Sequence, residues 1–363
     1  MLGLVLCNTW RIGAGRLKYS PGGAYKSPSV HCSLLVHGGP GNRSVFELSM
    51  EILYACPANV ATGGTELIHD IVSTLDSLDG VNAKILYMGG DQQDPCPREY
   101  REYGCKYVTE TTKCDVVIYP EIWANKALTD RACVRAVNWL GVDAYAGHTP
   151  VEQRGAFLED DRILHIAQSA YAEDFLRNLA VKNIYRLSDV LNRAFYEDYE
   201  EGQRDDTVLY NPAKATRFTY TLLAELERNG IRSKPIEGMT RQQVIDLMRS
   251  SKLYIDFGDF PGRERLPREA VMCGCCIITD KIGAARYTED FPIPYQYKFE
   301  RKEGHIFAIV KAVRYVLDNY DACREGFNTF RIILRNERNT LQDQCRELVK
   351  VFANEIQHNH SGL

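Results

Sequence analysis

The 363-residue sequence predicts an α/β protein with two domains, each built on a parallel sheet. Short apolar runs alternate with amphipathic segments from Met50 onward, and this alternation is typical of parallel sheets. It pauses at an acidic, polar stretch, 196–206, and then starts again. The length suffices for two domains of ordinary size. We therefore expect domains over 50–200 and 201–335, and a C-terminal helix and tail over 336–363.

The expected elements follow from apolar runs of strand length and from longer segments with helical periodicity. In the first domain the expected strands are 51–56, 83–89, 115–120, 135–140 and 162–168, and the expected helices are 66–75, 124–132 and 170–179. In the second domain the expected strands are 206–211, 232–238, 253–258 and 275–280. The helices expected there are 218–228, 241–250, a short one after Pro267, and most of 305–357.

Composition excludes several classes of protein. The net charge of -4 gives no electrostatic footprint for nucleic acid, and no apolar run approaches the ~20 residues that span a bilayer. Twelve cysteines, many inside expected strands, indicate reduced core thiols rather than a disulfide framework. The cluster Cys273, Cys275 and Cys276 lacks the spacing of a zinc site, so we expect no bound metal.

The first 49 residues differ from the rest of the chain. Glycine and proline are scattered through them, and neither a strand period nor a helix period is sustained. The opening apolar stretch has no basic region before it, so it is a poor signal peptide. Two interpretations stand: Met50 is the natural start and 1–49 an over-extended reading frame, or 1–49 is a genuine flexible extension.

The most informative segment, 234–299, reads as loop, helix, strand, glycine-rich loop, short helix and strand. In open parallel sheets, ligands bind at the ends of the strands. Here the loop after the strand contains Arg263, and Pro267 suits the first turn of the helix that follows. That start would place Arg268 and Glu269 beside free backbone N–H groups, which attract anions. The segment therefore predicts a site for a phosphorylated ligand.

The run PGRERLPREAVMCGCCII in this segment resembles the donor-binding half of GT-B glycosyltransferases, especially the retaining group that includes family 4. That group reads roughly E-G-F-G-L-P-x-x-E-A-M-A-C-G-x-P-V-I. The LP, EA, M and CG positions match, but LP and EA are one residue closer here, and the first family glutamate has no counterpart. Glu269 matches the second glutamate, which implies contact with the donor ribose. The resemblance implies two Rossmann-like domains facing a cleft.

Other strand ends supply further residues with counterparts in that group. Gly63 and Gly64 resemble its first-domain GG loop, and Lys214 stands where the group often has a cation for the donor diphosphate. The expected donor-binding residues are Gly63, Gly64, Asn211, Lys214, Gly238, Arg263, Arg268, Glu269, Gly283 and Ala284. The structural alternatives are a tight turn at the two glycines, a solvated lysine, and a helix cap at Thr240 beside Gly238.

Polar side chains at strand ends of the first domain are the candidates for the acceptor side. Glu121 and Asp143 are the expected catalytic carboxylates, and Ser169 and Tyr171 lie at similar positions. His165 falls inside an apolar strand, where a satisfied core histidine is the more ordinary interpretation.

We therefore expect a hexosyltransferase-like glycosyltransferase that moves a sugar from a nucleotide-sugar donor to a glycan, lipid-linked or other acceptor. Similar sequences occur in bacterial surface-polysaccharide assembly, so polysaccharide or glycoconjugate biosynthesis is the expected context. No DxD run follows a strand, which agrees with chemistry that needs neither metal nor cofactor. The expected location is the cytoplasm, or the inner face of the cell membrane as a peripheral protein. The alternatives are a nucleotide-sugar epimerase of the same fold and a non-catalytic nucleotide- or sugar-binding module.

Overall fold

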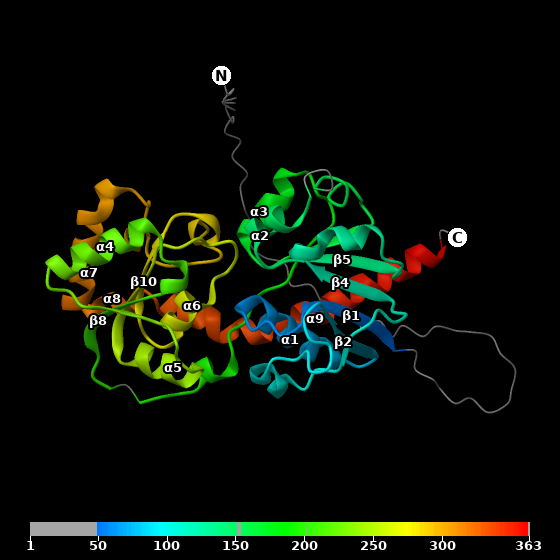
Figure 1. The fold of residues 1–363 in the computed structure, drawn as a ribbon, viewed down its shortest axis with the longest axis horizontal. Coiled ribbons are helices and arrows are strands. Elements are labelled where there is room, and N and C mark those ends of the chain that lie inside the picture. The colour runs from blue at the N-terminus through cyan, green and yellow to red at the C-terminus, as the bar shows by residue number, and fades with distance from the viewer. Residues whose placement is uncertain (1–48, 151–153, 201, 362–363) are drawn as a thin grey trace, which may run out of the picture. The chain divides into compact units, whose positions relative to one another are not determined.

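The structure is a computed structural model that describes residues 49–150, 154–200 and 202–361. The two interpretations of 1–49 concern residues that, except for Ser49, lie outside these ranges. The first strand begins at Met50, as the sequence predicts. Figure 1 shows the described elements coloured along the chain.

The first sheet has seven strands, all parallel, in the order β3-β2-β1-β4-β5-β6-β7. Its strands are β1 (Met50–Pro57), β2 (Val81–Met88), β3 (Tyr107–Val108), β4 (Val116–Pro120), β5 (Val134–Trp139), β6 (Ile163–Ala167) and β7 (Ile184–Arg186). The central strands β4 and β6 are buried along their whole length, as expected when helices cover both faces of a parallel sheet. The strand order reverses direction between β1 and β4.

The second sheet has five parallel strands in the order β12-β11-β10-β8-β9. Its strands are β8 (Asp205–Tyr210), β9 (Ser233–Pro235), β10 (Ser251–Asp256), β11 (Cys276–Asp280) and β12 (Lys298–Phe299). Here the order reverses between β8 and β10. Both predicted sheets, and their parallel strands, are therefore confirmed.

Nine α-helices connect and cover these strands within the described part of the chain. They are α1 (Gly63–Asp76), α2 (Val142–His148), α3 (Ala170–Asn178), α4 (Arg217–Arg228), α5 (Arg241–Arg249), α6 (Arg265–Met272), α7 (Ile306–Asp318), α8 (Tyr320–Glu325) and α9 (Asn328–Ser361). Threonine caps start three of the helices that follow strands, because the hydroxyls of Thr62, Thr216 and Thr240 accept from the backbone N–H three residues later.

Three differences from the expected elements have local causes. The segment expected as a helix over 124–132 is instead a 3-10 helix over Glu121–Leu128, with Trp123 outside helical geometry. Helix α6 begins at Arg265, two residues before Pro267, so Arg268 closes its first turn and Glu269 lies beyond that turn. The strands β3, β7 and β12 and the helix α2 were not expected, because strands of two or three residues and a helix of seven are too short to show a periodic pattern.

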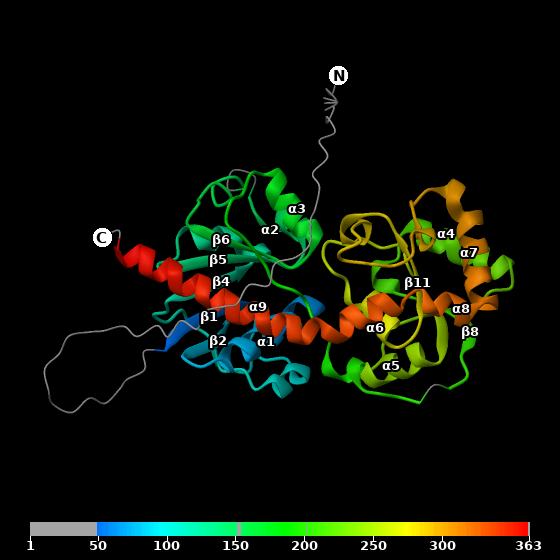
Figure 2. The same ribbon diagram turned by 180° about the vertical axis from the view of Figure 1, so that it is seen from behind.

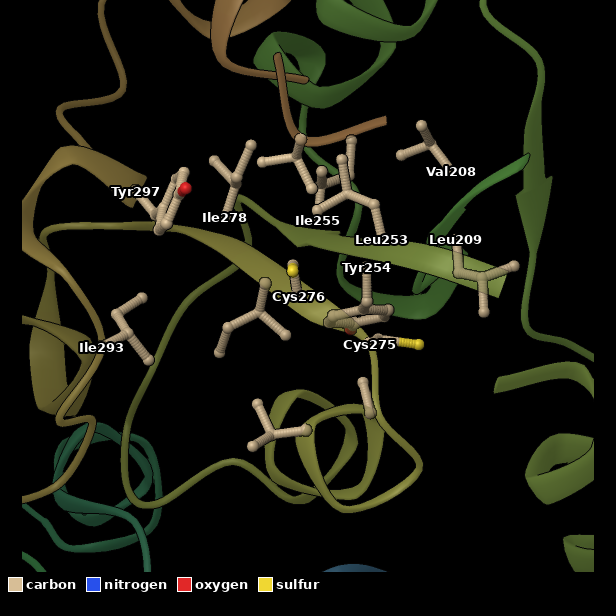
Figure 3. Packing of buried hydrophobic residues seen from close by; sticks show 14 of the residues in the cluster. Val208, Leu209, Leu253, Tyr254, Ile255, Cys275, Cys276, Ile278, Ile293 and Tyr297 are labelled. Atoms are coloured by element: carbon tan, nitrogen blue, oxygen red, sulfur yellow. The ribbon is translucent and has the colours of Figure 1, made fainter. Parts of the chain in front are cut away.

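The core of the second sheet is built from strand residues that alternate between its two faces. In Figure 3, Leu253 and Ile255 of β10 point to one side of the sheet and Tyr254 points to the other. Cys275 and Cys276 pack in the same cluster and are fully buried with free thiols. Their role is thus to fill the core, as the composition indicates.

Helix α9 belongs to the cores of both sheets. Phe330 and Leu334 pack with the second sheet, whereas Leu341, Cys345, Leu348 and Phe352 pack with the first. Figure 2 shows the helix, in orange and red, running from the second sheet along the back of the first. The chain thus returns to its first domain at its C-terminal end. Among the described residues, no helix is both long enough and apolar enough to cross a membrane.

Candidate functional site

A cavity of about 560 Å³ lies at the carboxyl ends of strands from both sheets. Its walls include residues that follow β1 and β8, which flank the points where the strand orders reverse. Ligands of open α/β sheets bind at such points. Its charged lining residues are Glu66, Glu99, Asp189, Lys214, Arg241, Asp256, Arg263, Glu264, Arg265 and Glu269. We call this space the donor cavity, since it gathers most of the residues expected to bind a donor.

The two glycines after β1 bring the start of α1 to the wall of this cavity. Gly63 opens the helix, and a Cβ atom there would lie 2.9 Å from Cδ of Arg265. The close approach therefore requires glycine or a shift of the arginine. Gly64 also lines the cavity. The glycines thus form a tight turn, as one alternative predicts, and they also line the cavity, so a role in ligand binding stays a prediction.

Every cation that lines the donor cavity already has a carboxylate partner. Lys214 pairs with Glu264, and Arg263 pairs with Glu337. Arg265 lies between the two domains, with Nη1 2.5 Å from Glu66 and Nη2 3.3 Å from Asp189. An anion entering the cavity would therefore have to exchange places with one of these carboxylates.

Glu66 is the centre of the contacts between the two domains. Besides the contact with Arg265, its carboxylate accepts hydrogen bonds from three side chains. The donors are the Arg241 guanidinium at 2.7 Å, the Tyr103 hydroxyl at 2.9 Å and the Asn192 amide at 2.8 Å. The sequence did not identify Glu66 or Arg241 as site residues, because they lie 175 positions apart in the chain. The sequence contains one indication of a site role for these two residues. Each lies in the first turn of a helix capped by threonine, near the end of a strand.

Arg268 does not line the donor cavity. Its side chain is completely buried, with Nη1 2.7 Å from Asp189 and Nη2 2.7 Å from Glu337. Burial alone would lower the pKa of the guanidinium, but Glu337 and Asp189 raise it above its ordinary value. The expectation that Arg268 faces a phosphate needs correction, because its guanidinium is enclosed by the carboxylates of Asp189 and Glu337.

Glu269 lines the cavity and is not paired. Among the described residues, no donor lies within hydrogen-bond or ion-pair distance of its carboxylate. Burial raises the pKa of Glu269 to about 7, although Arg265 lowers it in part. A buried carboxylate without a partner, in a cavity whose cations are all paired, is available to accept hydrogen bonds from a ligand.

Two further carboxylates of the cavity were not among the expected site residues. Glu264 is the partner of Lys214, and burial raises its pKa despite that contact. Asp256 ends β10 and accepts from the Gly258 N–H at 2.9 Å and the Tyr254 hydroxyl at 2.8 Å. Asn211, at the end of β8, also lines the cavity, as expected. The position of Asp256 at the end of a buried strand could have identified it from the sequence as a candidate site residue.

Besides Arg268, three of the expected donor residues lie outside the cavity walls. Gly238 has φ +63° and lies in the turn before Thr240, the cap of α5. Gly283 has φ +48°, and a side chain there would collide with the carbonyl oxygen of Phe260. The N–H of Ala284 donates to the same carbonyl at 2.9 Å. The Ala284 N–H is therefore occupied by the loop at 260 and is not free to bind a ligand.

The two expected catalytic carboxylates also lie outside the donor cavity. Glu121 is buried and accepts from the N–H groups of Leu140 at 2.9 Å and Gly141 at 3.1 Å. Burial raises its pKa to about 7. It lines a smaller cavity of about 260 Å³, which shares Leu140 with the donor cavity. Asp143 is exposed and accepts from the Tyr171 hydroxyl at 3.0 Å.

The remaining first-domain candidates have structural partners. Ser169 caps α3 by accepting from the Ala172 N–H at 2.9 Å. His165 is buried in β6 and accepts from the Trp139 indole N–H at 3.1 Å, as expected of a core histidine. No group of three His, Cys, Asp or Glu side chains in the described ranges is placed to hold a metal ion.

Comparison with known proteins identifies the fold but not the family. No family model matches the chain, and no curated protein matches its sequence. Among solved structures, Anabaena HepE, in complex with UDP and glucose, has a TM-score of 0.61 at 12% identity over 83% of this chain and 100% of that one. Sucrose-phosphate synthase from Thermosynechococcus elongatus has a TM-score of 0.56 at 11% identity, over 84% and 98%.

A solved epimerase structure is also similar to this chain, with a lower TM-score than the two transferases. UDP-GlcNAc 2-epimerase from Neisseria meningitidis, bound to UDP-GlcNAc, has a TM-score of 0.50 at 9% identity, over 84% and 100% of the two chains. At these identities the likenesses show the fold alone, which is the GT-B arrangement of two parallel-sheet α/β domains.

Proposed function

We propose that this protein is a glycosyltransferase that takes a sugar from a nucleotide-sugar donor, of the retaining family 4-like type. The observation that carries the proposal is the unpaired Glu269 in a cavity lined by four cations, where two parallel sheets meet at their strand ends. The bound UDP and UDP-glucose of HepE support it, since that protein has a similar fold.

The donor nucleotide would lie against the second domain. Glu269 would accept hydrogen bonds from the ribose hydroxyls, and Lys214 would contact the diphosphate after exchanging Glu264 for a phosphate oxygen. Phosphate and carboxylate both bind such cations through charge-assisted hydrogen bonds, so the exchange keeps the lysine paired. Gly63 and Gly64 would let the start of α1 approach the sugar-phosphate from the first domain.

Catalysis in this proposal comes from positioning and from stabilisation of the departing diphosphate by cations and backbone N–H groups. The acceptor would enter beside the smaller cavity, where Glu121 has a pKa near working pH and is thus suited to exchange a proton. Asp143, which is farther along the same edge, remains a second candidate. The acceptor class that we propose is a glycan or a lipid-linked saccharide, in polysaccharide or glycoconjugate synthesis in the cytoplasm.

A nucleotide-sugar epimerase is the second candidate, because a bacterial epimerase has a similar fold. The decisive experiment incubates the protein with a panel of UDP-, GDP-, dTDP- and ADP-sugars, with and without saccharide acceptors. A transferase releases nucleoside diphosphate and forms a new glycoside. An epimerase changes the sugar and leaves the nucleotide bonded to it. If the protein binds a donor but does neither, the non-catalytic module is the correct description.

Nucleoside diphosphate is expected to stabilise the protein without a divalent metal. The cavity supplies cations of its own, and at a ligand concentration 100-fold above Kd the folded state gains about 2.7 kcal/mol. Thermal unfolding with UDP, GDP or ADP in the presence of EDTA measures this gain. A shift that requires Mg²⁺ or Mn²⁺ would contradict the metal-free proposal.

The variant Lys214→Ala is expected to weaken nucleoside diphosphate binding by about 1.5–3 kcal/mol, the range for hydrogen bonds to a charged group. Since this variant also leaves Glu264 unpaired, the double variant Lys214→Ala/Glu264→Gln separates loss of the cation from repulsion by the freed carboxylate. Lys106→Ala is the matched control, because Lys106 pairs with Asp76 at 3.0 Å outside the cavity. Calorimetric affinities within twofold of the parent for both Lys214 variants would show that the diphosphate lies elsewhere.

A further inference from the structure

A second hollowed region surrounds α7 in the C-terminal half of the chain. It consists of two cavities, of about 730 Å³ and 300 Å³, which share Gln296 in their walls. No residue of either wall also lines the donor cavity. We call this region the α7 surface. The side chains that define it are Lys281, Tyr295, Gln296, Phe307, Lys311, Arg314 and Tyr315.

Three aromatic side chains project from the α7 surface. Tyr295 is 76% exposed, Phe307 70% and Tyr315 57%. Single exposed hydrophobic residues are ordinary on a protein surface, but clusters of them mark sites of interaction. Here Phe307 and Tyr315 line the larger cavity and Tyr295 lines the adjoining one, so the three rings belong to one continuous surface region.

Cations lie directly beside these rings. The ammonium nitrogen of Lys281 is 4.0 Å from the centroid of the Tyr295 ring, and that of Lys311 is 4.6 Å from the Phe307 ring. The two cavities are lined by three cations that reach the surface, Lys281, Lys311 and Arg314, and by two carboxylates, Glu300 and Asp318, whereas Lys298 in the smaller cavity is buried. The α7 surface is therefore locally positive on a chain whose net charge is -4.

We propose that the α7 surface binds the face of a membrane that contains anionic phospholipid. Aromatic side chains favour the membrane–water interface, where an apolar ring can enter the headgroup region. Lysines beside the rings would contact anionic headgroups at the same depth. A protein partner usually receives its anchor residues in pockets. Rings that project with more than half of their surface exposed suit a fluid layer, which needs no matching pocket.

The proposal is independent of the donor cavity, because neither its residues nor its test involves nucleotide binding. The test uses the full chain in co-sedimentation with vesicles of phosphatidylcholine alone and of phosphatidylcholine with one quarter phosphatidylglycerol. We expect binding to the anionic vesicles only, with weaker binding at high salt. The variants Phe307→Ser/Tyr315→Ser and Lys281→Glu/Lys311→Glu should each reduce the affinity for vesicles by at least about tenfold.

Matched controls lie in the first domain. Tyr107 is 48% exposed and Lys182 has a side chain that is 72% exposed, so Tyr107→Ser and Lys182→Glu make the same chemical changes elsewhere. Both controls should bind vesicles like the parent. Circular dichroism and thermal unfolding show that each variant is folded.

Four outcomes would overturn the proposal. The first is no binding to anionic vesicles, and the second is binding that all four α7-surface substitutions leave unchanged. The third is a parent chain that binds polyglutamate but not vesicles, which would assign the surface to an acidic protein. The fourth is dimerisation in sedimentation equilibrium that Phe307→Ser/Tyr315→Ser abolishes while vesicle binding is absent, which would assign it to a second copy of the chain.

Discussion

Arg268→Ala is expected to lower the free energy of unfolding by about 3–5 kcal/mol, the range for removing one partner of a buried ion pair. The arginine is completely buried between Asp189 and Glu337, whose side chains are 2% and 4% exposed. Its loss would leave two carboxylates without their main partner, on the first domain and on α9. Urea denaturation measures the change, and Arg346→Ala is the control because Arg346 forms an exposed pair with Asp343.

The pH dependence gives this prediction a second readout. Burial would raise the pKa of Asp189, but Arg268, Arg265 and Arg263 outweigh it and lower the pKa below its ordinary value. A lowered pKa stabilises the fold above about pH 4, the unfolded value, and this contribution is lost as the pH falls through the folded value. The Arg268→Ala variant should lose part of that dependence. If the variant is as stable as the parent but binds nucleotide tenfold more weakly, Arg268 faces the ligand after all.

Glu269→Gln is expected to weaken nucleoside diphosphate binding by about 1.5–3 kcal/mol, which is roughly 10- to 150-fold. The glutamine keeps the size of the side chain but loses the charge that would strengthen hydrogen bonds from ribose hydroxyls. In the parent, burial raises the pKa of Glu269 to about 7, so the fraction of ionised carboxylate grows between pH 6 and pH 8. Affinity in the parent should therefore rise over this range, whereas the variant should show no such rise from this group.

The contribution of Glu269 to the stability of the fold should change with pH in the opposite direction to its contribution to nucleotide affinity. A glutamate with a folded pKa near 7 and an unfolded pKa near 4.3 binds more protons when folded, so its contribution to stability falls as the pH rises between these values. Because glutamine does not ionise, the Glu269→Gln variant does not lose stability in this way as the pH rises. It should be more stable than the parent at pH 8, but not at pH 4.5. A residue that only complements a helix dipole would give lower stability and unchanged affinity. Titration calorimetry and thermal unfolding at both pH values distinguish the two roles.

The sequence predicted the parallel sheets well because their signal is local. An apolar run of strand length, as in β4 or β11, is visible without knowledge of its neighbours. The same reasoning placed Lys214 and Glu269 at a strand-end cavity, which the structure contains. Local signals also located Thr240 as the cap of α5, because a hydroxyl before an amphipathic segment is a typical start.

Side-chain partners were beyond reach because they come from distant parts of the chain. Whether Arg268 faces a ligand depends on where α6 begins and on Glu337, which lies 69 positions later. Likewise, Gly283 resembles a ligand-binding glycine in sequence. In the structure, glycine is required there because a side chain would collide with the carbonyl oxygen of Phe260. A motif therefore identifies the neighbourhood of a site, while the choice between inward and outward side chains is made by tertiary packing.

The return of α9 to the first sheet has a consequence for biosynthesis. When the strands of the first domain emerge from the ribosome, four residues that fill the core of that domain have not yet been synthesised. They are Leu341, Cys345, Leu348 and Phe352. Domains that emerge first usually fold first during translation. Here the earlier domain stays incomplete, with an apolar face uncovered, until α9 has been synthesised and has left the ribosome. Its maturation is therefore tied to the synthesis of a helix that comes after the whole second domain, and the yield of folded protein should depend on how well this face is shielded until then.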